Sequence, residues 1–200
     1  MDSYLSIAGP SYGEIEKIKG SRFLSAAFPL SAVSDAEKAL DTVRKAHQGA
    51  THHCYAWRIV VQGQKSSDDG EPAGTAGKPI ASQIAGHELW DVLVVVVRYY
   101  GGTKLGTGGL IRAYAAAAKA VLTDAVFVER RKMATLRVTH AYEHASAIAA
   151  VIARYQIEIV ARRYDVTTYL ELSVPEVKLR LVIADLRDAT SGQAIIESLS

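Results

Sequence analysis

The sequence predicts a two-domain α+β protein, and three observations support this. The chain has 200 residues, of which 49% are hydrophobic and 22% charged, so it can fold as one large or two small domains. Strand-like and helix-like patterns alternate along its whole length. Their rhythm changes after the polar stretch FVERRK at 127–132, which we expect to be a linker. We therefore expect one domain at 1–128 and another at 129–200.

The first domain begins with extended segments and a helix. Residues 12–30 are typical of two strands joined by a turn at Gly20-Ser21. Ser34 and Glu37 have the spacing of a capping box, with the serine at the N-cap and the glutamate three residues later. Apolar residues then recur at helical spacing, and Gly49 marks the expected end of the helix.

Two further strands and two helices follow in the same domain. Residues 55–62 are typical of a strand, and residues 63–79 of a long loop rich in glycine and proline. A short helix is expected near 80–87. The unbroken apolar run at the start of Val92–Tyr100 predicts that this segment is a central strand buried on both faces. An Ala-rich helix at about 108–125 would pack closely on the sheet.

The second domain shows the order β-α-β-β-α-β, which is the ferredoxin-like pattern. Its two middle strands form an expected hairpin around Tyr164-Asp165, and Pro175 stands where a first helical turn tolerates proline. The expected elements are a strand at Met133–His140, a helix at Glu143–Tyr155, strands at Ile157–Arg162 and Val166–Val174, a helix from Pro175 to Ala189 and a strand at Ala194–Leu199.

Bulk composition predicts a cytoplasmic protein without a membrane partner. The net charge of +2 lacks the basic excess of a dedicated nucleic-acid binder. One cysteine, Cys54, excludes an intrachain disulfide and fits a reducing compartment. The first residues lack the basic and apolar regions of a signal peptide. The longest apolar run, Val92–Val97, is far shorter than the roughly 20 residues that span a bilayer.

A loop with five glycines in nine residues joins the central strand to the Ala-rich helix. Free amides and the helix dipole at such a junction favour an anion. Thr107 is an expected helix cap. Tyr99, Tyr100 and Tyr114 are expected to offer stacking surfaces for bases. The candidate anion-binding or nucleic-acid-binding residues are Arg98, Tyr99, Tyr100, Gly101, Gly102, Lys104, Gly106, Thr107, Gly108, Gly109 and Arg112.

The loop does not match the common phosphate-binding fingerprints. Gly106 is followed by Thr107-Gly108, whereas a Walker A motif continues with Lys and Ser or Thr. The dinucleotide fingerprint also fails, because no glycine stands three residues after Gly108. Tight turns and close packing of the helix explain the glycines equally well, so both interpretations stay open.

Acidic, histidine and cysteine side chains precede this loop. Asp68, Asp69 and Glu71 are close enough in sequence to hold a hard cation, but a solvated loop, with Lys78 paired to one acid, is favoured. We expect no metal and no other cofactor. His52 and Cys54 point the same way from an extended chain. Packing is favoured over a Cys–His nucleophile, because no third orienting group is evident.

Four segments of the first domain resemble motifs of the YigZ/IMPACT family, also called uncharacterised protein family 0029. They are SRFL at 21–24, THHCYA at 51–56, SDDGEPAGTAGKP at 67–79 and VVRYYGGTKLGTGGLIRAY at 96–114. Ala73 stands where serine is common in the family. Within these motifs we expect His52, Cys54, Asp68, Asp69, Glu71, Lys78 and Arg22 to support the site.

The resemblance implies a fold and a field of activity. The first domain should resemble domain 2 of ribosomal protein S5, which is shared with domain IV of elongation factor G, and the second should resemble domain V of that factor. Eukaryotic family members regulate translation through a kinase pathway with an additional N-terminal domain. This chain begins almost directly at the family domain, so the resemblance does not allow a kinase-pathway partner to be inferred.

Three functions remain open from the sequence. We favour a non-enzymatic binding protein that contacts RNA or the ribosome through the glycine-rich loop, with tyrosines as stacking surfaces. The second is an enzyme on a small phosphorylated substrate, with an acid of the acidic loop as base or metal ligand and His52 as proton shuttle. The third is a protein-interaction module.

Overall fold

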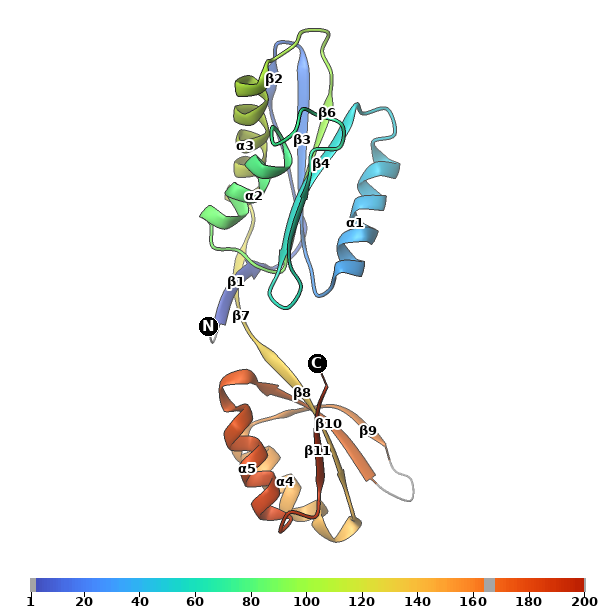
Figure 1. Ribbon diagram of the computed structural model, residues 1–200, viewed down its shortest axis with the longest axis vertical. Helices are drawn as coiled ribbons and strands as arrows, with labels where there is room; N and C mark the ends of the chain where they lie inside the picture. The colour runs from blue at the N-terminus through green and yellow to red at the C-terminus, as the bar shows by residue number, and fades with distance from the viewer. Residues whose placement is uncertain (1–2, 164–167, 200) are drawn as a thin grey trace. The chain divides into compact units, whose positions relative to one another are not determined.

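The computed structural model describes residues 3–163 and 168–199 of the chain. Its contacts divide the chain into one compact unit at Tyr4–Arg130 and another that begins at Arg131 (Figure 1). Each unit contains both helices and strands, which confirms a mixed α/β protein. We call them the N-terminal unit and the C-terminal unit.

A five-stranded antiparallel sheet organises the N-terminal unit. Its strand order is β2-β3-β6-β4-β5. The strands are β2 (Ser11–Ile18), β3 (Ser21–Pro29), β6 (Val92–Tyr99), β4 (His52–Ile59) and β5 (Gly63–Ser67). The central position of β6 confirms the prediction from its apolar run, since Val95 and Val96, which face opposite sides of the sheet, are both fully buried.

Helices cover both faces of this sheet. Helices α2 (Gly77–Gly86) and α3 (Thr107–Thr123) pack side by side on one face, and α1 (Val33–Ala46) lies on the other (Figure 1). The small side chains of Ala113 and Ala117 are buried, which lets α3 approach the sheet closely. Each face therefore has its own apolar cluster with β6 in the middle.

The helix α1 is capped differently from the prediction. It begins at Val33, with Ala32 at the N-cap, so Ser34 is already helical. The carboxylate of Asp35 accepts hydrogen bonds from the backbone N–H groups of Ser31 (3.0 Å) and Ala32 (3.1 Å). The predicted capping box was wrong because the acid one residue after Ser34 reaches these free amides. The helix also ends at Ala46, before Gly49.

Two segments predicted as irregular are partly strands. The stretch 63–79 contains β5 and the first turn of α2, so the loop between them is only 68–76. The expected linker 127–132 contains β7 (Phe127–Arg131), which pairs with β1 (Ser3–Ile7) in a two-stranded sheet. Neither segment has a long apolar run. β5 pairs as a hairpin with β4, which directly precedes it, whereas β1, the partner of β7, is remote in sequence.

The C-terminal unit has the predicted order of elements. Its antiparallel sheet has the strand order β11-β8-β10-β9, and its two α-helices share one apolar cluster with that sheet. The elements are β8 (Met133–His140), α4 (Ala145–Tyr155), β9 (Glu158–Arg163), β10 (Thr168–Pro175), α5 (Leu179–Ala189) and β11 (Ile195–Leu199).

Short 3-10 turns precede both helices of this unit, at Tyr142–His144 and Glu176–Lys178. Pro175 ends β10 rather than opening the first helical turn as expected. The predicted hairpin turn at Tyr164-Asp165 lies outside the described residues.

Candidate functional site

The glycine-rich loop connects the end of β6 to the start of α3. Gly106 is the N-cap of α3 and has a φ of 72°, a conformation that favours glycine. Thr107 is therefore the first helical residue and not the expected cap; among the described side chains, none caps this helix. The first turn of a helix leaves its amides without intrahelical acceptors, so Thr107, Gly108 and Gly109 present free N–H groups here.

The glycines of the loop serve two different purposes. A Cβ atom on Gly101 would lie 1.9 Å from the carbonyl carbon of Gly20, so the loop packs backbone to backbone against the β2–β3 turn. Gly102 resembles Gly106 in having a positive φ, of 85°. Close packing thus explains one glycine and tight turning explains two more. Gly108 is exposed at the helix start, where packing does not require it.

A cavity of about 310 Å³ opens beside the start of α3. Its wall comes from the acidic loop, from the end of β6 and from the glycine-rich loop. The lining residues are Glu71, Pro72, Arg98, Tyr100, Lys104, Leu105, Gly106, Thr107 and Leu110. We call this space the α3 cavity. It brings together five of the predicted binding residues and one predicted support residue.

The charge of Arg98 is neutralised inside the protein. Its side chain is buried and donates a hydrogen bond of 2.6 Å from Nη1 to Oε1 of Glu71. Its Nη2 donates to the Ser21 hydroxyl at 3.3 Å, and its Nε has no partner in the described part of the chain. The prediction treated Arg98 as a free cation at the loop entrance, but it mainly positions Glu71 in the cavity wall.

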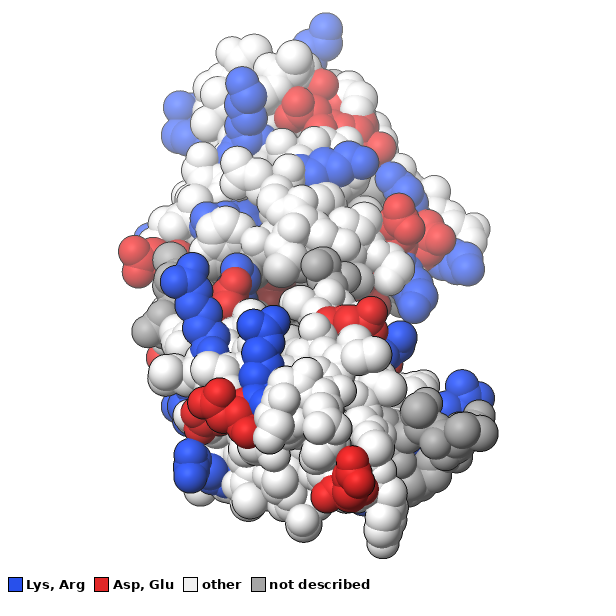
Figure 2. Space-filling view, turned by 60° about the horizontal axis from the view of Figure 1, so that its bottom comes forward, with Lys and Arg blue, Asp and Glu red and all other residues white. Residues whose placement is uncertain are grey.

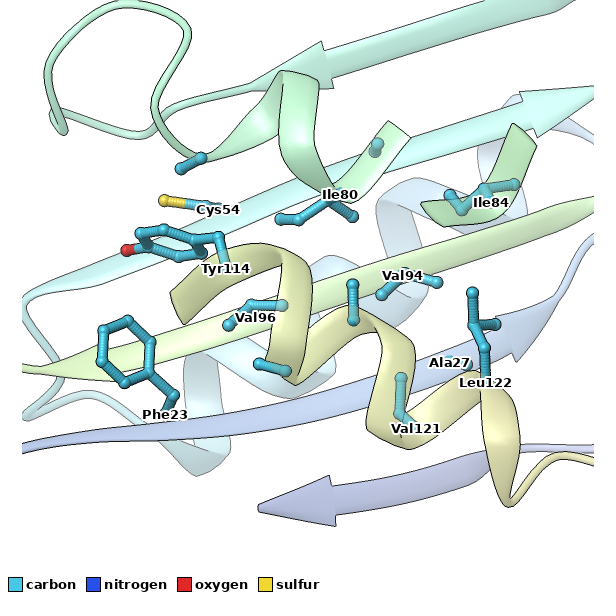
Figure 3. Packing of buried hydrophobic residues seen from close by; sticks show 14 of the residues in the cluster. Phe23, Ala27, Cys54, Ile80, Ile84, Val94, Val96, Tyr114, Val121 and Leu122 are labelled. Carbon is cyan, nitrogen blue, oxygen red and sulfur yellow. The ribbon is translucent and has the colours of Figure 1, made fainter. Parts of the chain in front are cut away.

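Tyr114 on α3 also binds the Glu71 carboxylate. Its hydroxyl donates a hydrogen bond of 2.7 Å to Glu71 Oε1. Figure 3 shows its ring between Cys54 and Phe23, and the ring packs edge-on against Phe23. Because this side chain is fully buried, the expectation that Tyr114 offers a stacking surface was wrong. Burial also raises the pKa of Tyr114.

The two aspartates of the acidic loop hold the loop in shape. Asp68 accepts backbone hydrogen bonds from Gly74, Ala76 and Gly77 at 2.8–2.9 Å. Burial opposes ionisation of this carboxyl, but these three N–H groups outweigh it and lower the pKa of Asp68. Asp69 accepts a hydrogen bond of 2.6 Å from the His53 amide.

Lys78 lies close enough to Asp68 for its positive charge to contribute to that lowered pKa. Within the described residues, however, Lys78 forms no ion pair with the acids, contrary to expectation.

His52 and Cys54 lie on β4, and both side chains contact the acidic loop. The Nδ1 of His52 lies 2.8 Å from the Asp69 carbonyl, which fixes a proton on that nitrogen, and its Nε2 lies 3.8 Å from Glu71 Oε1. The Cys54 thiol donates to the Asp68 carbonyl at 3.0 Å. Burial raises the pKa of Cys54 to about 12, so the thiol is protonated at neutral pH and unsuited to nucleophilic attack.

The tyrosines at the end of β6 divide between two places. Tyr99 hydrogen-bonds to His47 Nδ1 at 3.0 Å and lies on the α1 side of the sheet, with Arg22 against its ring at 5.8 Å. Arg22 itself pairs with Glu14. Tyr100 instead lines the α3 cavity, is 47% exposed and packs near Arg98 at 5.5 Å. Of these three predicted residues, only Tyr100 faces the cavity.

Ser21 and Tyr114 hold the cavity wall in place without lining it, and the sequence did not predict this role for either. Ser21 holds both Arg98 and the Gly101 amide, at 3.3 and 3.2 Å, and it is the first residue of the quoted SRFL motif. Tyr114 was noticed, but for the wrong role. The loop 68–76 contributes Glu71 and Pro72 to the cavity wall. No signal in the sequence linked Glu71 to Arg98.

The described residues contain no set of three or more His, Cys, Asp or Glu side chains placed to hold a metal ion. Among their helices, none has the length and apolar character needed to cross a bilayer.

Comparisons with known proteins cover the whole chain. The chain is 34% identical over 196 residues to the IMPACT family member YigZ of Escherichia coli strain K12, covering 96% of both proteins. It is 32% identical over 199 residues to the IMPACT family member YvyE of Bacillus subtilis strain 168, covering 98% of this chain and 91% of that one. A solved crystal structure described as a hypothetical protein matches with a TM-score of 0.76 and 32% identity, over 100% of this chain and 98% of the other.

A family model described as the Impact N-terminal domain matches residues 19–122, which include the acidic loop, the central strand and the glycine-rich loop. The sequence similarity over most of the chain and the matching structure agree with this result. The chain belongs to the IMPACT family.

Proposed function

We propose that this protein is a non-enzymatic RNA-binding protein that acts in translation or its regulation, and that it holds an RNA phosphate at the start of α3. One observation carries the proposal. Thr107, the first residue of α3, lines a cavity that Lys104 also lines, and the free amides of Gly108 and Gly109 follow it in the same helical turn. Free amides, the helix dipole and a lysine together form a site for an anion.

The cations around the start of α3 are available to a ligand. Lys104 is exposed, and so is Arg112, whose Nη1 lies 3.5 Å from the Cβ position of Gly108. Neither forms an ion pair in the described part of the chain. Since Glu71 is already paired with Arg98, the positive charge at the helix start exceeds the negative charge.

The half-exposed ring of Tyr100 gives the site a surface for a base. Aromatic side chains stack on unpaired bases, and each such contact contributes about 1–3 kcal/mol. On the face that Figure 2 shows, basic and acidic side chains are interspersed without an extended area of one sign. Binding would therefore depend on this local site and on single-stranded segments rather than on a broad basic surface.

The finer fold assignment supports a place in translation. Numbered within the C-terminal unit, its strands have the order 4-1-3-2 and the chain order βαββαβ, as in ferredoxin-like domains. We assign residues 129–200 to such a domain, similar to domain V of elongation factor G, and residues 1–128 to an IMPACT-type domain similar to domain 2 of ribosomal protein S5. The ribosome in the cytoplasm is the partner that this assignment favours.

The alternative enzyme has less support. Asp68, Asp69 and Glu71 were its expected bases or metal ligands. The two aspartates accept backbone hydrogen bonds that hold the acidic loop, and Glu71 is already bonded to Arg98 and Tyr114. Cys54 is protonated and buried. The small volume of the α3 cavity is the observation that favours a small phosphorylated ligand, and the experiment below includes that outcome.

The test is a titration of a structured RNA by fluorescence anisotropy at several salt concentrations. Lys104→Ala removes one phosphate contact, so binding should weaken for all RNA sequences. The slope of log affinity against log salt should flatten by about one unit. The matched control is Lys45→Ala, which removes the same charge from an exposed position on α1, on the opposite face of the sheet.

Three outcomes distinguish the candidates. RNA binding that Lys104→Ala weakens and Lys45→Ala leaves unchanged supports the proposal. Equal salt curves for wild type and Lys104→Ala contradict it. Turnover of a small phosphorylated compound that Asp68→Asn and Asp69→Asn abolish would support the enzyme instead.

A further inference from the structure

The carboxylate of Glu71 uses only one of its two oxygens inside the protein. Oε1 accepts the hydrogen bonds from Arg98 Nη1 and Tyr114, and it is also the oxygen near His52 Nε2. Oε2 has no hydrogen-bond partner among the described residues, and it is not among the buried atoms that lack one. Since Glu71 lines the α3 cavity, Oε2 is a free acceptor at the cavity wall.

This acceptor is fixed in place and its charge is balanced. The Glu71 side chain is only 3% exposed, and Arg98, which pairs with it, is 5% exposed. A buried pair of this kind gives Oε2 a fixed position, and the arginine reduces repulsion between the carboxylate and an anion in the same cavity. The start of α3 therefore offers backbone N–H donors for an anion, and the cavity wall offers one hydrogen-bond acceptor, Glu71 Oε2.

We infer that Glu71 Oε2 accepts a hydrogen bond from a ribose 2′-hydroxyl, so that the α3 cavity selects RNA over DNA. A ribonucleotide combines an anionic phosphate with a nearby hydroxyl donor, and DNA lacks the 2′ donor. A fixed carboxylate is also the group that holds a ribose hydroxyl beside a helix N-terminus in dinucleotide-binding folds. This inference rests on the proposed function, because it names the feature of the nucleic acid that the same site recognises.

The test alters the ligand, because a change at Glu71 would also remove the partner of Arg98. Three short single-stranded oligouridylates are compared on the wild-type protein: the ribo form, the 2′-deoxy form and the 2′-fluoro form. The 2′-fluoro group keeps a small electronegative substituent but cannot donate. Loss of a hydrogen bond to a charged acceptor should weaken binding by about tenfold or more for both analogues.

A spectroscopic measurement assigns the effect to the correct residue. The ¹³C resonance of the Glu71 carboxyl carbon should shift with the ribo form and not with the 2′-fluoro form. The amides of Thr107, Gly108 and Gly109 should shift with all three, because the phosphate is common to them.

The outcomes separate this inference from the proposed function. Equal affinities for all three oligonucleotides, with shifts at the three amides, would overturn the role of Glu71 and leave phosphate binding intact. Discrimination without a shift of the Glu71 carboxyl carbon would also overturn it. Absence of shifts at the amides with every oligonucleotide would contradict both.

Discussion

Glu71 and Arg98 show how a buried ion pair shapes this site. Arg98 lies near the end of the central strand β6, and Glu71 lies in the loop 68–76. Arg98 Nη1 nevertheless lies only 2.6 Å from Glu71 Oε1. Removing one partner of a buried pair leaves the other charge without compensation. The pair therefore ties the acidic loop to the sheet, beyond any role in binding.

At this scale we predict that Glu71→Ala lowers the free energy of unfolding by about 3–5 kcal/mol, since it leaves the Arg98 guanidinium buried and unpaired. Denaturant unfolding measures this. The matched control is Glu14→Ala, which removes the partner of Arg22 from an exposed ion pair and should change stability little. Equal losses in the two variants would show that the Glu71–Arg98 pair is not held in the buried geometry.

The glycine-rich loop is the element that joins the end of the central strand to the start of α3 beside the α3 cavity. Its glycines were open to two interpretations. The structure shows close packing at Gly101 and tight turns at Gly102 and Gly106, while anion binding at the helix start stays a proposal. Gly101 is required by the approach of the β2–β3 turn, whereas Gly108 leaves the helix start open. Fold and site thus depend on neighbouring residues of one loop.

At the scale of this element we predict that Gly101→Ala is strongly destabilising. Its Cβ would lie 1.9 Å from a backbone atom of Gly20, so the two segments must separate, which typically costs about 1–3 kcal/mol or more. Gly86→Ala is the control, because this helical position has no atom within 4 Å of an added Cβ. There alanine should stabilise by about 0.5–1 kcal/mol. Thermal unfolding of both variants tests the contrast, and a neutral Gly101→Ala would refute the close approach.

At the scale of the whole molecule, two units have separate apolar cores. The C-terminal cluster includes Leu172, and the N-terminal clusters include Leu93, with no residue shared. Both tryptophans, Trp57 and Trp90, belong to the N-terminal unit. Tryptophan fluorescence therefore reports on one unit, while far-ultraviolet circular dichroism reports on both.

We predict that Leu172→Ala, which empties part of a fully buried site, lowers the stability of the C-terminal unit by about 2–5 kcal/mol. Circular dichroism should show an earlier transition, whereas the tryptophan transition should not move. Leu93→Ala is the counterpart and should shift the tryptophan transition. Parallel shifts of both signals in Leu172→Ala would mean that the units unfold as one cooperative body.

Elements whose residues carry a strong local pattern could be predicted from the sequence alone. The unbroken apolar run predicted β6 at the centre of its sheet, and the rhythm after residue 132 predicted β8, α4, β9, β10, α5 and β11 in the observed order. The motifs also predicted the family, which the comparisons confirmed. These features depend on periodicity and composition over short stretches, which a single sequence contains.

The contacts between side chains at the candidate site follow from the three-dimensional packing of segments that are far apart in the chain. Packing of the loop 68–76 against the sheet brought Glu71 to Arg98, and packing of α3 buried Tyr114 against the same carboxylate. Pairing with remote segments also made β7 a strand. Such contacts join residues tens of positions apart, and their energies come from burial and mutual compensation of charge. A local pattern does not encode these energies, so the sequence pointed to the loop but not to the wall of the cavity beside it.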